Sequence, residues 1–427
     1  MVPTPVEQTF TNVACTACGC VCDDLTLRFR EGQLISAEPH CPLAEQWLAR
    51  WRTGSPIAQH RIGSRQVSYA EAIQAATQVL RQAQAPLIYG LSRSSTPGQR
   101  AAIGLADRLG GVLDTTASVC HGPSIMAIQE VGESTCSLGE ISQRADLVIY
   151  WGANPMVSHP RHLERYSAEP VSEWLPHGRR DRTLAVVDIA LTETARQSDL
   201  FVEVVPGRDF ELIWQLRAAL RTLSRCGELP PELPPPTREL LLQMTNCRYG
   251  AVFFGLGIAQ AHLGHTVVAG LLRLVAELNQ FNRFVARRLR IPGDVAGADS
   301  TLCWQTGYPF AVDFSRGYPR YQPGEFTASS LLERGDVDAC VLVGAESLPE
   351  FSGSAREQLQ QLPTIVLDPP HAPVQLAEAI TIHTATYGIE AAGTAYRMDE
   401  IPIPLRKLLP TTLPTDEQVL NDIRQGL

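Results

Sequence analysis

A series of short apolar runs constrains the fold of this chain more than any other feature. Each run either ends in aspartate or has a glycine at or near its end, and helical stretches separate many of them. Continuous runs rich in β-branched residues are typical of strands buried on both faces of a parallel sheet. The sequence therefore predicts the α/β class, with doubly wound parallel sheets and sites at the carboxyl ends of the strands. The runs are residues 85–91, 145–155, 183–188, 200–207, 251–257, 339–346 and 364–368.

With 427 residues, the chain is too long for one ordinary core. We expect a small cysteine-rich domain at 1–67, an α/β domain at 68–235, and a second α/β domain with a C-terminal extension at 236–427. The proline-rich stretch 226–240 is typical of a surface linker or a domain boundary.

Four cysteines near the N-terminus have the spacing C-x2-C-x3-C-x18-C, and a fifth, Cys20, lies between them. Alternating residues after the third cysteine predict a β-hairpin, which would return the chain to the fourth. Four thiolates hold either a zinc ion or a four-iron four-sulfur (4Fe–4S) cluster. The single C-x2-C pair favours the cluster, with zinc and a metal-free remnant as alternatives, and we interpret Cys20 as a non-ligand. The four candidate ligands are Cys15, Cys18, Cys22 and Cys41.

Composition argues against two classes of partner. The formal net charge is -9, from 36 basic and 45 acidic residues, so a nucleic-acid binder is not expected. The apolar runs are far shorter than the roughly 20 residues that span a bilayer. The N-terminus lacks a basic segment followed by an apolar one, as a signal peptide would have. We therefore expect a cytoplasmic protein without a membrane segment. In the reducing cytoplasm, clustered cysteines bind metal more often than they form disulfides.

The pair Cys120-His121 stands between two α/β elements. A cysteine next to a histidine in this position is compatible with a metal ligand or a thiol nucleophile. The alternative is a buried cysteine beside the start of a helix.

Further polar residues follow predicted strands. Asn154 ends one run, Asp188 ends the next, and Gly207 and Asp209 follow the one after that. An acid at a strand tip, followed by a glycine turn and another acid, is common in nucleotide contacts, but taken alone it is weak evidence. Histidines such as His159 are most often structural.

Five segments together resemble the B subunit of formylmethanofuran dehydrogenase, in the molybdopterin oxidoreductase superfamily. They are CTACGCVCDDL, SVCHGPS, WGANPMVSHPRHLERYS, residues 304–326 and residues 393–406. The resemblance runs from about residue 12 to residue 405, which is nearly the whole chain.

The resemblance implies a reaction and its cofactors. The family reversibly reduces CO2 to formate at tungsten or molybdenum held by two pterin guanine dinucleotides. Cys120 would supply the protein thiolate to that metal, and the four N-terminal cysteines would hold the 4Fe–4S cluster. His121 would carry protons with a pKa near neutrality, and Arg290 would hold the carboxylate-like substrate. The dinucleotides would be contacted by Asn154, Asp188, Gly207 and Asp209.

The resemblance also implies an assembly. The C-terminal β-barrel cap of the superfamily would be missing here and supplied by a D subunit. An amidohydrolase-like A subunit would condense formate with methanofuran, and a C subunit completes the complex. Such a chain is an oxidoreductase subunit of one-carbon metabolism, as in methanogenesis.

Two departures from the family pattern leave an alternative open. Ile189-Ala190 stands where the family has Pro-Arg, and Pro292-Gly293 stands where it has His-Tyr. Both lie at expected cofactor or substrate sites. The bacterial formyltransferase/hydrolase complex, which releases formate from a formylated carrier, contains a related B subunit that need not do redox chemistry. In that case the pterin would be lost.

Overall fold

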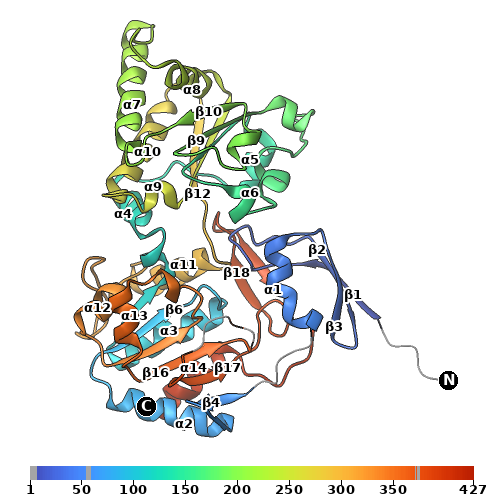
Figure 1. Cartoon of the computed structure of the whole chain (residues 1–427), viewed down its shortest axis with the longest axis vertical. Helices are drawn as coiled ribbons and strands as arrows, with labels where there is room; N and C mark the ends of the chain where they lie inside the picture. The colour runs from blue at the N-terminus through green and yellow to red at the C-terminus, as the bar shows by residue number, and fades with distance from the viewer. Residues whose placement is uncertain (1–6, 54–58, 371, 373–375) are drawn as a thin grey trace, which may run out of the picture. The chain divides into compact units, whose positions relative to one another are not determined.

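The computed structural model describes residues 7–53, 59–370, 372 and 376–427 (Figure 1). The chain divides into two compact units. Unit 1 comprises Met1–Val119 and Ile291–Leu427, and unit 2 comprises Cys120–Arg290. Unit 1 is discontinuous because strands late in the chain return to pair with an early one. These boundaries differ from those of the three consecutive domains expected at 1–67, 68–235 and 236–427. The division into three domains is finer than the division into two units, and it stays a prediction.

Unit 2 is built on a parallel sheet of five strands in the order β10-β9-β8-β11-β12. The chain order reverses between β8 and β11, so the sheet is doubly wound and has a topological switch point there. Four of its strands were predicted from apolar runs, and these are confirmed. The strands are β8 (Leu147–Trp151), β9 (Thr183–Asp188), β10 (Leu200–Glu203), β11 (Tyr249–Phe254) and β12 (Arg283–Arg288).

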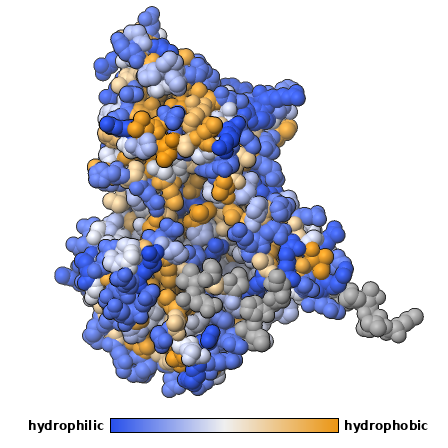
Figure 2. Space-filling view, viewed as in Figure 1, coloured by the Kyte–Doolittle hydropathy of each residue, from blue (hydrophilic) through white to orange (hydrophobic). Residues whose placement is uncertain are grey.

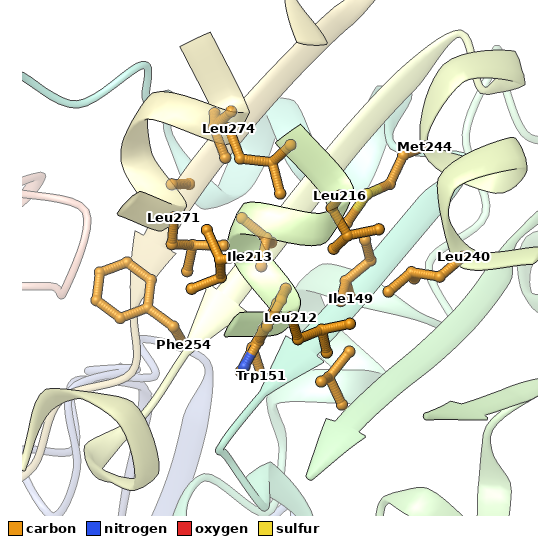
Figure 3. Packing of buried hydrophobic residues seen from close by; sticks show 14 of the residues in the cluster. Ile149, Trp151, Leu212, Ile213, Leu216, Leu240, Met244, Phe254, Leu271 and Leu274 are labelled. Atoms are coloured by element: carbon orange, nitrogen blue, oxygen red, sulfur yellow. The ribbon is translucent and has the colours of Figure 1, made fainter. Parts of the chain in front are cut away.

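Helices bury one face of this sheet in a large apolar core (Figure 3). Ile149 and Trp151 of β8 pack there with Leu212 and Leu216, and both faces of β8 are buried. On the other face Tyr150 stacks on Phe253 at 5.5 Å between ring centroids. The helices of unit 2 are α4 (Gly122–Val131), α5 (Leu138–Arg144), α6 (Pro155–Ser158), α7 (Asp209–Cys226), α8 (Pro235–Asn246), α9 (Leu256–Ala259) and α10 (Gly264–Leu278). The middle of the proline-rich stretch, residues 227–234, thus connects α7 and α8 inside unit 2, and its last six residues begin α8.

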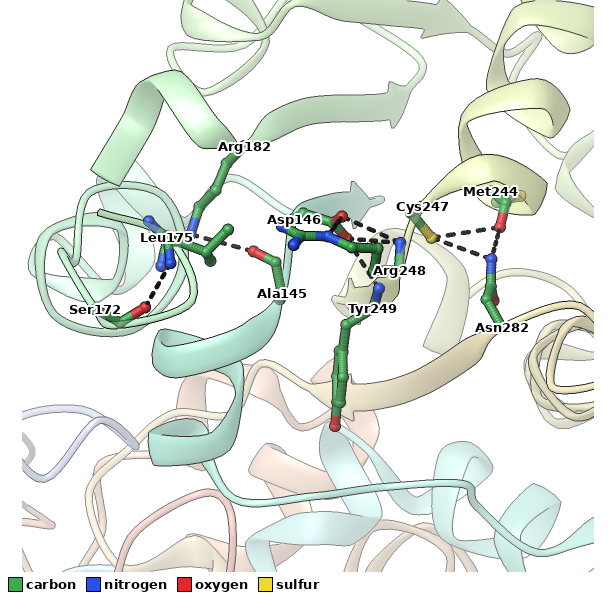
Figure 4. Close-up of polar contacts among 10 residues, drawn as sticks. All are labelled: Ala145, Asp146, Ser172, Leu175, Arg182, Met244, Cys247, Arg248, Tyr249 and Asn282. Atoms are coloured by element: carbon green, nitrogen blue, oxygen red, sulfur yellow. Dashed lines mark hydrogen bonds and ion pairs between the residues drawn. The ribbon is translucent and has the colours of Figure 1, made fainter. Parts of the chain in front are cut away.

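Polar contacts fix the amino ends of the strands in the unit 2 sheet (Figure 4). The Asp146 carboxylate, just before β8, accepts hydrogen bonds from the backbone nitrogens of Arg248 and Tyr249 at 3.1 and 2.9 Å. Asn282 donates to Met244 O at 2.7 Å just before β12. The strands therefore start from fixed positions, and their carboxyl ends carry the candidate residues.

Unit 1 contains a nine-stranded sheet in the order β14-β13-β7-β6-β15-β16-β17-β4-β5, with a parallel centre and antiparallel edges. Its switch point lies between β6 and β15. Three central strands were predicted from apolar runs and are confirmed: β6, β15 and β16. The strands are β4 (His60–Ile62), β5 (Arg65–Val67), β6 (Pro86–Gly90), β7 (Val112–Thr115), β13 (Val312–Asp313), β14 (Arg320–Tyr321), β15 (Ala339–Val343), β16 (Thr364–Asp368) and β17 (Ile380–His383).

The N-terminal hairpin is confirmed. β2 (Leu25–Arg30) and β3 (Gln33–Glu38) pair antiparallel, and β1 (Glu7–Val13) joins β2. Glu31 and Gly32 both have positive φ, as a two-residue hairpin turn that follows the strand twist requires. Helix α1 (Pro42–Thr53) starts directly after Cys41.

The C-terminal stretch forms α14 (Asp416–Gly426), which a capping box starts at Thr415. The remaining elements of unit 1 are α2 (Tyr69–Gln82), α3 (Thr96–Leu109), α11 (Val295–Thr306), α12 (Ala328–Arg334), α13 (Gly353–Leu359), β18 (Gly393–Tyr396) and β19 (Pro402–Leu405). Among the described residues, no helix combines the length and apolar character needed to cross a bilayer.

Unit 2 exposes several large apolar side chains, and Figure 2 shows that apolar residues gather on its visible face. Six of these side chains lie near the carboxyl edge of the sheet or on α7. They are Val157, Ile189, Leu191, Val205, Phe210 and Trp214.

Candidate functional site

The five N-terminal cysteines lie together in unit 1, and all are at least 92% buried. Four occupy the loop between β1 and β2, and Cys41 lies just before α1. Within the loop, Cys15 N donates to Cys22 O at 2.8 Å and Val21 N to Cys18 O at 3.1 Å. Met398 N donates to Gly19 O at 2.8 Å, which ties the loop to the C-terminal part of the unit.

The four predicted ligand thiols are near enough to interact electrostatically. Burial raises the pKa of Cys15 well above its usual value, and the charges of Cys22, Cys18 and Cys41 raise it further. Burial also raises the pKa of Cys41. Such thiols ionise only beside a cation, so the donor set fits a positively charged metal or iron–sulfur group. In the part of the chain that the structure describes, no three His, Cys, Asp or Glu side chains meet around one metal-ion position. The ligand assignment stays a prediction.

Cys20 lies between these thiols, and its pKa is raised, like those of Cys15 and Cys41, but for a different main cause. Hydrogen bonds with the side chains of Cys18 and Cys22 raise its pKa, with burial adding to the effect. Cys20 is therefore engaged with the side chains of its two neighbouring thiols, and its interpretation as a non-ligand stays a prediction.

A pocket of about 380 Å³ lies at the switch point of unit 1, beside the cysteine loop. Ser92 donates to Glu346 at 3.0 Å across this point, and Arg93 donates to Thr16 O at 3.1 Å. Three polar atoms of its lining residues are buried without a hydrogen-bond partner, and such atoms mark a ligand site when a pocket adjoins them. They are Glu346 Oε2, Thr386 Oγ1 and Tyr387 Oη. Sequence reasoning missed these residues; only the strand ends at Gly90 and Gly344 signalled the location.

The Cys120-His121 pair lies at the start of α4 in unit 2, and Cys120 is partly exposed while His121 is buried. Both His121 ring nitrogens have partners: Nε2 lies 3.0 Å from Leu289 O, and Nδ1 lies 3.0 Å from Ser124 Oγ. Burial, with help from Arg290 and Arg288, lowers the pKa of His121 well below its usual value. The expectation of a pKa near neutrality was therefore wrong. The ring is neutral, because its charged form would be both desolvated and close to cations.

Arg290 is the last residue of unit 2 and is 2% exposed. Its carbonyl oxygen lies 2.8 Å from Nε2 of His159, which is also buried. Leu289 N donates to Phe254 O at 2.9 Å, so the segment follows the edge of the sheet after β12. The structure thus brings Arg290, His121 and His159 together within unit 2.

The four residues predicted to contact dinucleotides share the carboxyl edge of the unit 2 sheet. Asp209 accepts a hydrogen bond from Trp151 Nε1 at 2.8 Å, and its charge raises the pKa of Asp188, although burial is the larger cause. Asn154 is committed internally, since it donates to Glu193 at 2.6 Å and accepts from Thr194 Oγ1 at 2.7 Å. Gly207 lies in the turn before α7 with φ +79°. Asp188 and Asp209 are neighbours, and Asn154 shapes the loop after β9. Their cofactor contacts stay predictions.

Glycines make the switch point of unit 2 possible, and sequence reasoning missed two of them. A Cβ at Gly257 would lie 2.8 Å from the Cα of Gly152, and one at Gly255 would lie 2.5 Å from Gly152 O. Two backbones approach here more closely than side chains allow. The clue was the run FFGLG.

One departure from the family pattern has a structural counterpart. A Cβ at Gly293 would lie 2.3 Å from the backbone oxygen of Thr16, in the cysteine loop. A tyrosine would not fit there unless the loop moved. Gly293 and the cysteine loop are therefore matched to each other in this chain.

These features define a doubly wound α/β protein with a cysteine-rich hairpin region at its N-terminus. No family model matches the chain. The B subunit of the tungsten-containing formylmethanofuran dehydrogenase 2 of Methanocaldococcus jannaschii is 36% identical over 421 residues, 96% of each chain. That of Methanococcus maripaludis is 34% identical over 97% of each. The B subunit of the formyltransferase/hydrolase complex of Methylorubrum extorquens is 25% identical over 65% of this chain and 72% of its own.

Two solved structures share the fold. The formyltransferase/hydrolase complex from Methylorubrum extorquens aligns with a TM-score of 0.70 at 22% identity, over 86% of this chain and 98% of that one. Acetylene hydratase from Pelobacter acetylenicus aligns with a TM-score of 0.68 at 12% identity, over 98% of this chain and 69% of that one. On the sequence identities, the chain belongs to the family of formylmethanofuran dehydrogenase B subunits, which are parts of an oxidoreductase.

Proposed function

We propose that this chain is the catalytic B subunit of a formylmethanofuran dehydrogenase-type complex. It interconverts CO2 and formate at tungsten or molybdenum held by two pterin guanine dinucleotides, coupled to formation or breakdown of formylmethanofuran. The observation that carries the proposal is the buried group of cysteines. All four predicted cluster ligands persist with Cys120 and His121 in a chain whose near full-length relatives are tungsten-containing dehydrogenase subunits.

The residues present fit the proposed cofactors. Cys15, Cys18, Cys22 and Cys41 would hold a 4Fe–4S cluster, and Cys120 would bind the tungsten or molybdenum. The pocket beside the cysteine loop, with its three buried unpartnered atoms, supports a place for one dinucleotide in unit 1. The second dinucleotide would lie along the edge of unit 2, against Asp188, Gly207 and Asp209. When bound, these groups would carry the two electrons that are exchanged when CO2 and formate interconvert.

The protein itself would bind and orient the substrate. Arg290, a buried guanidinium, would bind formate through paired N–H donors, and its burial strengthens the attraction. His121 would act as a neutral ring, because its pKa lies far below neutrality and both nitrogens are engaged. We propose it as an orienting group at physiological pH rather than as a cationic proton carrier.

The exposed apolar residues of unit 2 support assembly with other subunits. We propose the partners implied by the family: an amidohydrolase-like A subunit, a C subunit and a β-barrel D subunit, in the cytoplasm.

A second function is favoured by a specific observation. Ile189 and Ala190 replace a Pro-Arg pair, which removes a cation beside the proposed dinucleotide site, and Ile189 is half exposed there. This change favours a B subunit without redox activity in a formyltransferase/hydrolase complex that releases formate.

Metal content separates the two functions. The complex is purified anaerobically, and its iron, tungsten and molybdenum are measured together with the EPR spectrum of the reduced sample. We expect about four irons per chain, as one cubane cluster requires, and tungsten or molybdenum beside it. Cys18→Ser should lose most of the iron, whereas the matched variant Cys226→Ser, at an exposed cysteine, should keep it.

The contrary results are equally clear. Iron without tungsten or molybdenum would overturn the catalytic proposal and leave an electron-carrying or structural relic. Neither metal would leave the formate-releasing scaffold as the function.

A further inference from the structure

Two buried histidines of unit 2 hold consecutive carbonyl groups. His121 Nε2 lies 3.0 Å from Leu289 O, and His159 Nε2 lies 2.8 Å from Arg290 O. Each of these histidine residues is 1% exposed. The Leu289 carbonyl belongs to the peptide before the Arg290 Cα, and the Arg290 carbonyl belongs to the peptide after it. The two contacts together fix both peptide planes that flank this residue, and so the direction in which its side chain leaves the backbone.

The carbonyl oxygen at Nε2 sets the tautomer of each ring, and a serine lies at the other ring nitrogen. Because a carbonyl oxygen only accepts, each Nε2 must carry its proton, and in the neutral ring Nδ1 is then an acceptor. Ser124 Oγ lies 3.0 Å from Nδ1 of His121, and Ser158 Oγ lies 2.9 Å from Nδ1 of His159. Ser158 Oγ also lies 3.1 Å from Asn154 O, so its single proton serves one of these acceptors at a time.

We infer that His159 is a positioning residue, which holds the Arg290 backbone so that the guanidinium can meet a carboxylate or similar small anion. The inference rests on the proposed function for the identity of that anion. His159 reaches the site from the loop after α6, whereas His121 reaches it from the start of α4, so two independent elements hold one arginine. A histidine with a purely local structural role could contact any carbonyl group nearby. Here the two histidines contact the carbonyl groups of two consecutive residues, Leu289 and Arg290.

The test uses the anaerobic complex and three variants. His159→Leu removes the donor, His159→Gln keeps an N–H near the Nε2 position, and His177→Gln changes an exposed histidine of the same unit as a matched control. The first readout is hydrogen exchange at the Leu289 amide. This amide lies in the same segment as Arg290 and donates a hydrogen bond to Phe254 O, at the end of β11. The second is the KM and kcat for formate.

We expect His159→Leu to raise both the Leu289 exchange rate and the KM by about tenfold, with kcat changed much less, because one buried hydrogen bond is lost. His159→Gln should restore both values, and His177→Gln should leave them unchanged. If the leucine variant does not fold, His159→Asn replaces it, because asparagine keeps a donor only near Nδ1 and should behave as the loss of the bond.

Unchanged exchange in His159→Leu would overturn the inference, and so would a glutamine variant that fails to rescue. A higher KM with unchanged exchange would also overturn it, since the effect would not pass through the Arg290 segment. The exchange readout needs no turnover. A wild-type complex that neither binds nor oxidises formate would therefore reject the proposed function, while the exchange data still judge the role of His159 in holding the segment.

Discussion

The two units differ in the kind of ionisable group that they bury most deeply, although unit 2 also buries Asp209 and unit 1 also holds the partly buried His383. Unit 1 buries carboxyl groups: burial raises the pKa of Asp114 to about 7 and that of Asp416 to about 6. Unit 2 buries imidazoles: burial lowers the pKa of His159 to about 4 and that of His162 well below its usual value. Both sets are neutral in weakly acidic solution, because desolvation penalises the charged form of either kind.

The difference gives the units opposite responses to pH. A folded carboxyl with a raised pKa binds a proton that the unfolded chain releases, so stability falls as pH rises between the two pKa values. A folded imidazole with a lowered pKa rejects a proton that the unfolded chain binds, so stability falls as pH drops between its two values. Through these groups unit 1 should be weakened above about pH 4, and unit 2 below about pH 6.5. The partly buried His383 of unit 1, with a pKa of about 4, and Asp209 of unit 2, whose pKa burial raises, oppose these trends in part.

The largest expected effect is the acid sensitivity of unit 2. With a folded pKa of about 4, His159 alone should cost about 2 kcal/mol of unfolding free energy at pH 5 relative to pH 8. His121 and His162 should add to that cost. Hydrogen exchange of the β8 and β11 amides, corrected for the intrinsic effect of pH, measures the change. The β6 and β15 amides of unit 1 are followed in the same samples. We expect a smaller loss there, because the partly buried His383 and His60 act against the buried carboxyl groups of that unit.

Equal losses in both units at pH 5 would contradict this comparison. So would a His162→Phe variant with the same acid sensitivity as the wild type, since that variant removes one titrating ring without adding a charge.

A second prediction reverses the sign in unit 1. Asp114 accepts hydrogen bonds from Ala311 N at 3.0 Å and Ala328 N at 2.7 Å. Between pH 5 and pH 7 its raised pKa should cost the wild type about 2 kcal/mol. Asp114→Asn should lack this slope, although it is less stable at pH 5 because an amide cannot accept at both positions. Exchange of the β15 amides in both proteins, at both pH values, measures the two slopes.

Parallel slopes for the variant and the wild type would show that Asp114 titrates at an ordinary pKa. The opposite titration of the two units would then rest on the imidazoles alone.

Much of the fold could be predicted, and the reason is local. The seven apolar runs are β strands, because a strand buried on both faces must be apolar at every position. β12 was missed, since RFVARR ends in two arginines whose burial depends on groups far away in the sequence. β7 was missed because it has only four residues and includes the buried Asp114. The discontinuity of unit 1 has no local signal at all.

The candidate site divides in the same way. Its cysteines and strand tips could be named from spacing, and the structure groups the cysteines in one buried loop region. The pKa of His121 could not be predicted from the sequence, because it depends on burial and on Arg288 and Arg290, which lie more than 160 residues away in the sequence. The role of Asn154 could not be predicted either, because its side chain forms hydrogen bonds with Glu193 and Thr194.

The smallest expected effect compares two buried carboxyl groups of unit 1, Asp416 and Asp114, by the size of their pH-dependent change in stability. Asp416, in the first turn of α14, has a pKa of about 6 because hydrogen bonds from Thr384 and Ser94 offset part of the burial. Asp416→Asn should therefore remove a slope of only about 1 kcal/mol between pH 5 and pH 7, half that of Asp114. Ser94→Ala takes away one donor, so it should raise the pKa of Asp416 and steepen the slope. If Ser94→Ala flattens the slope instead, burial is not what sets the titration of the carboxyl groups in unit 1.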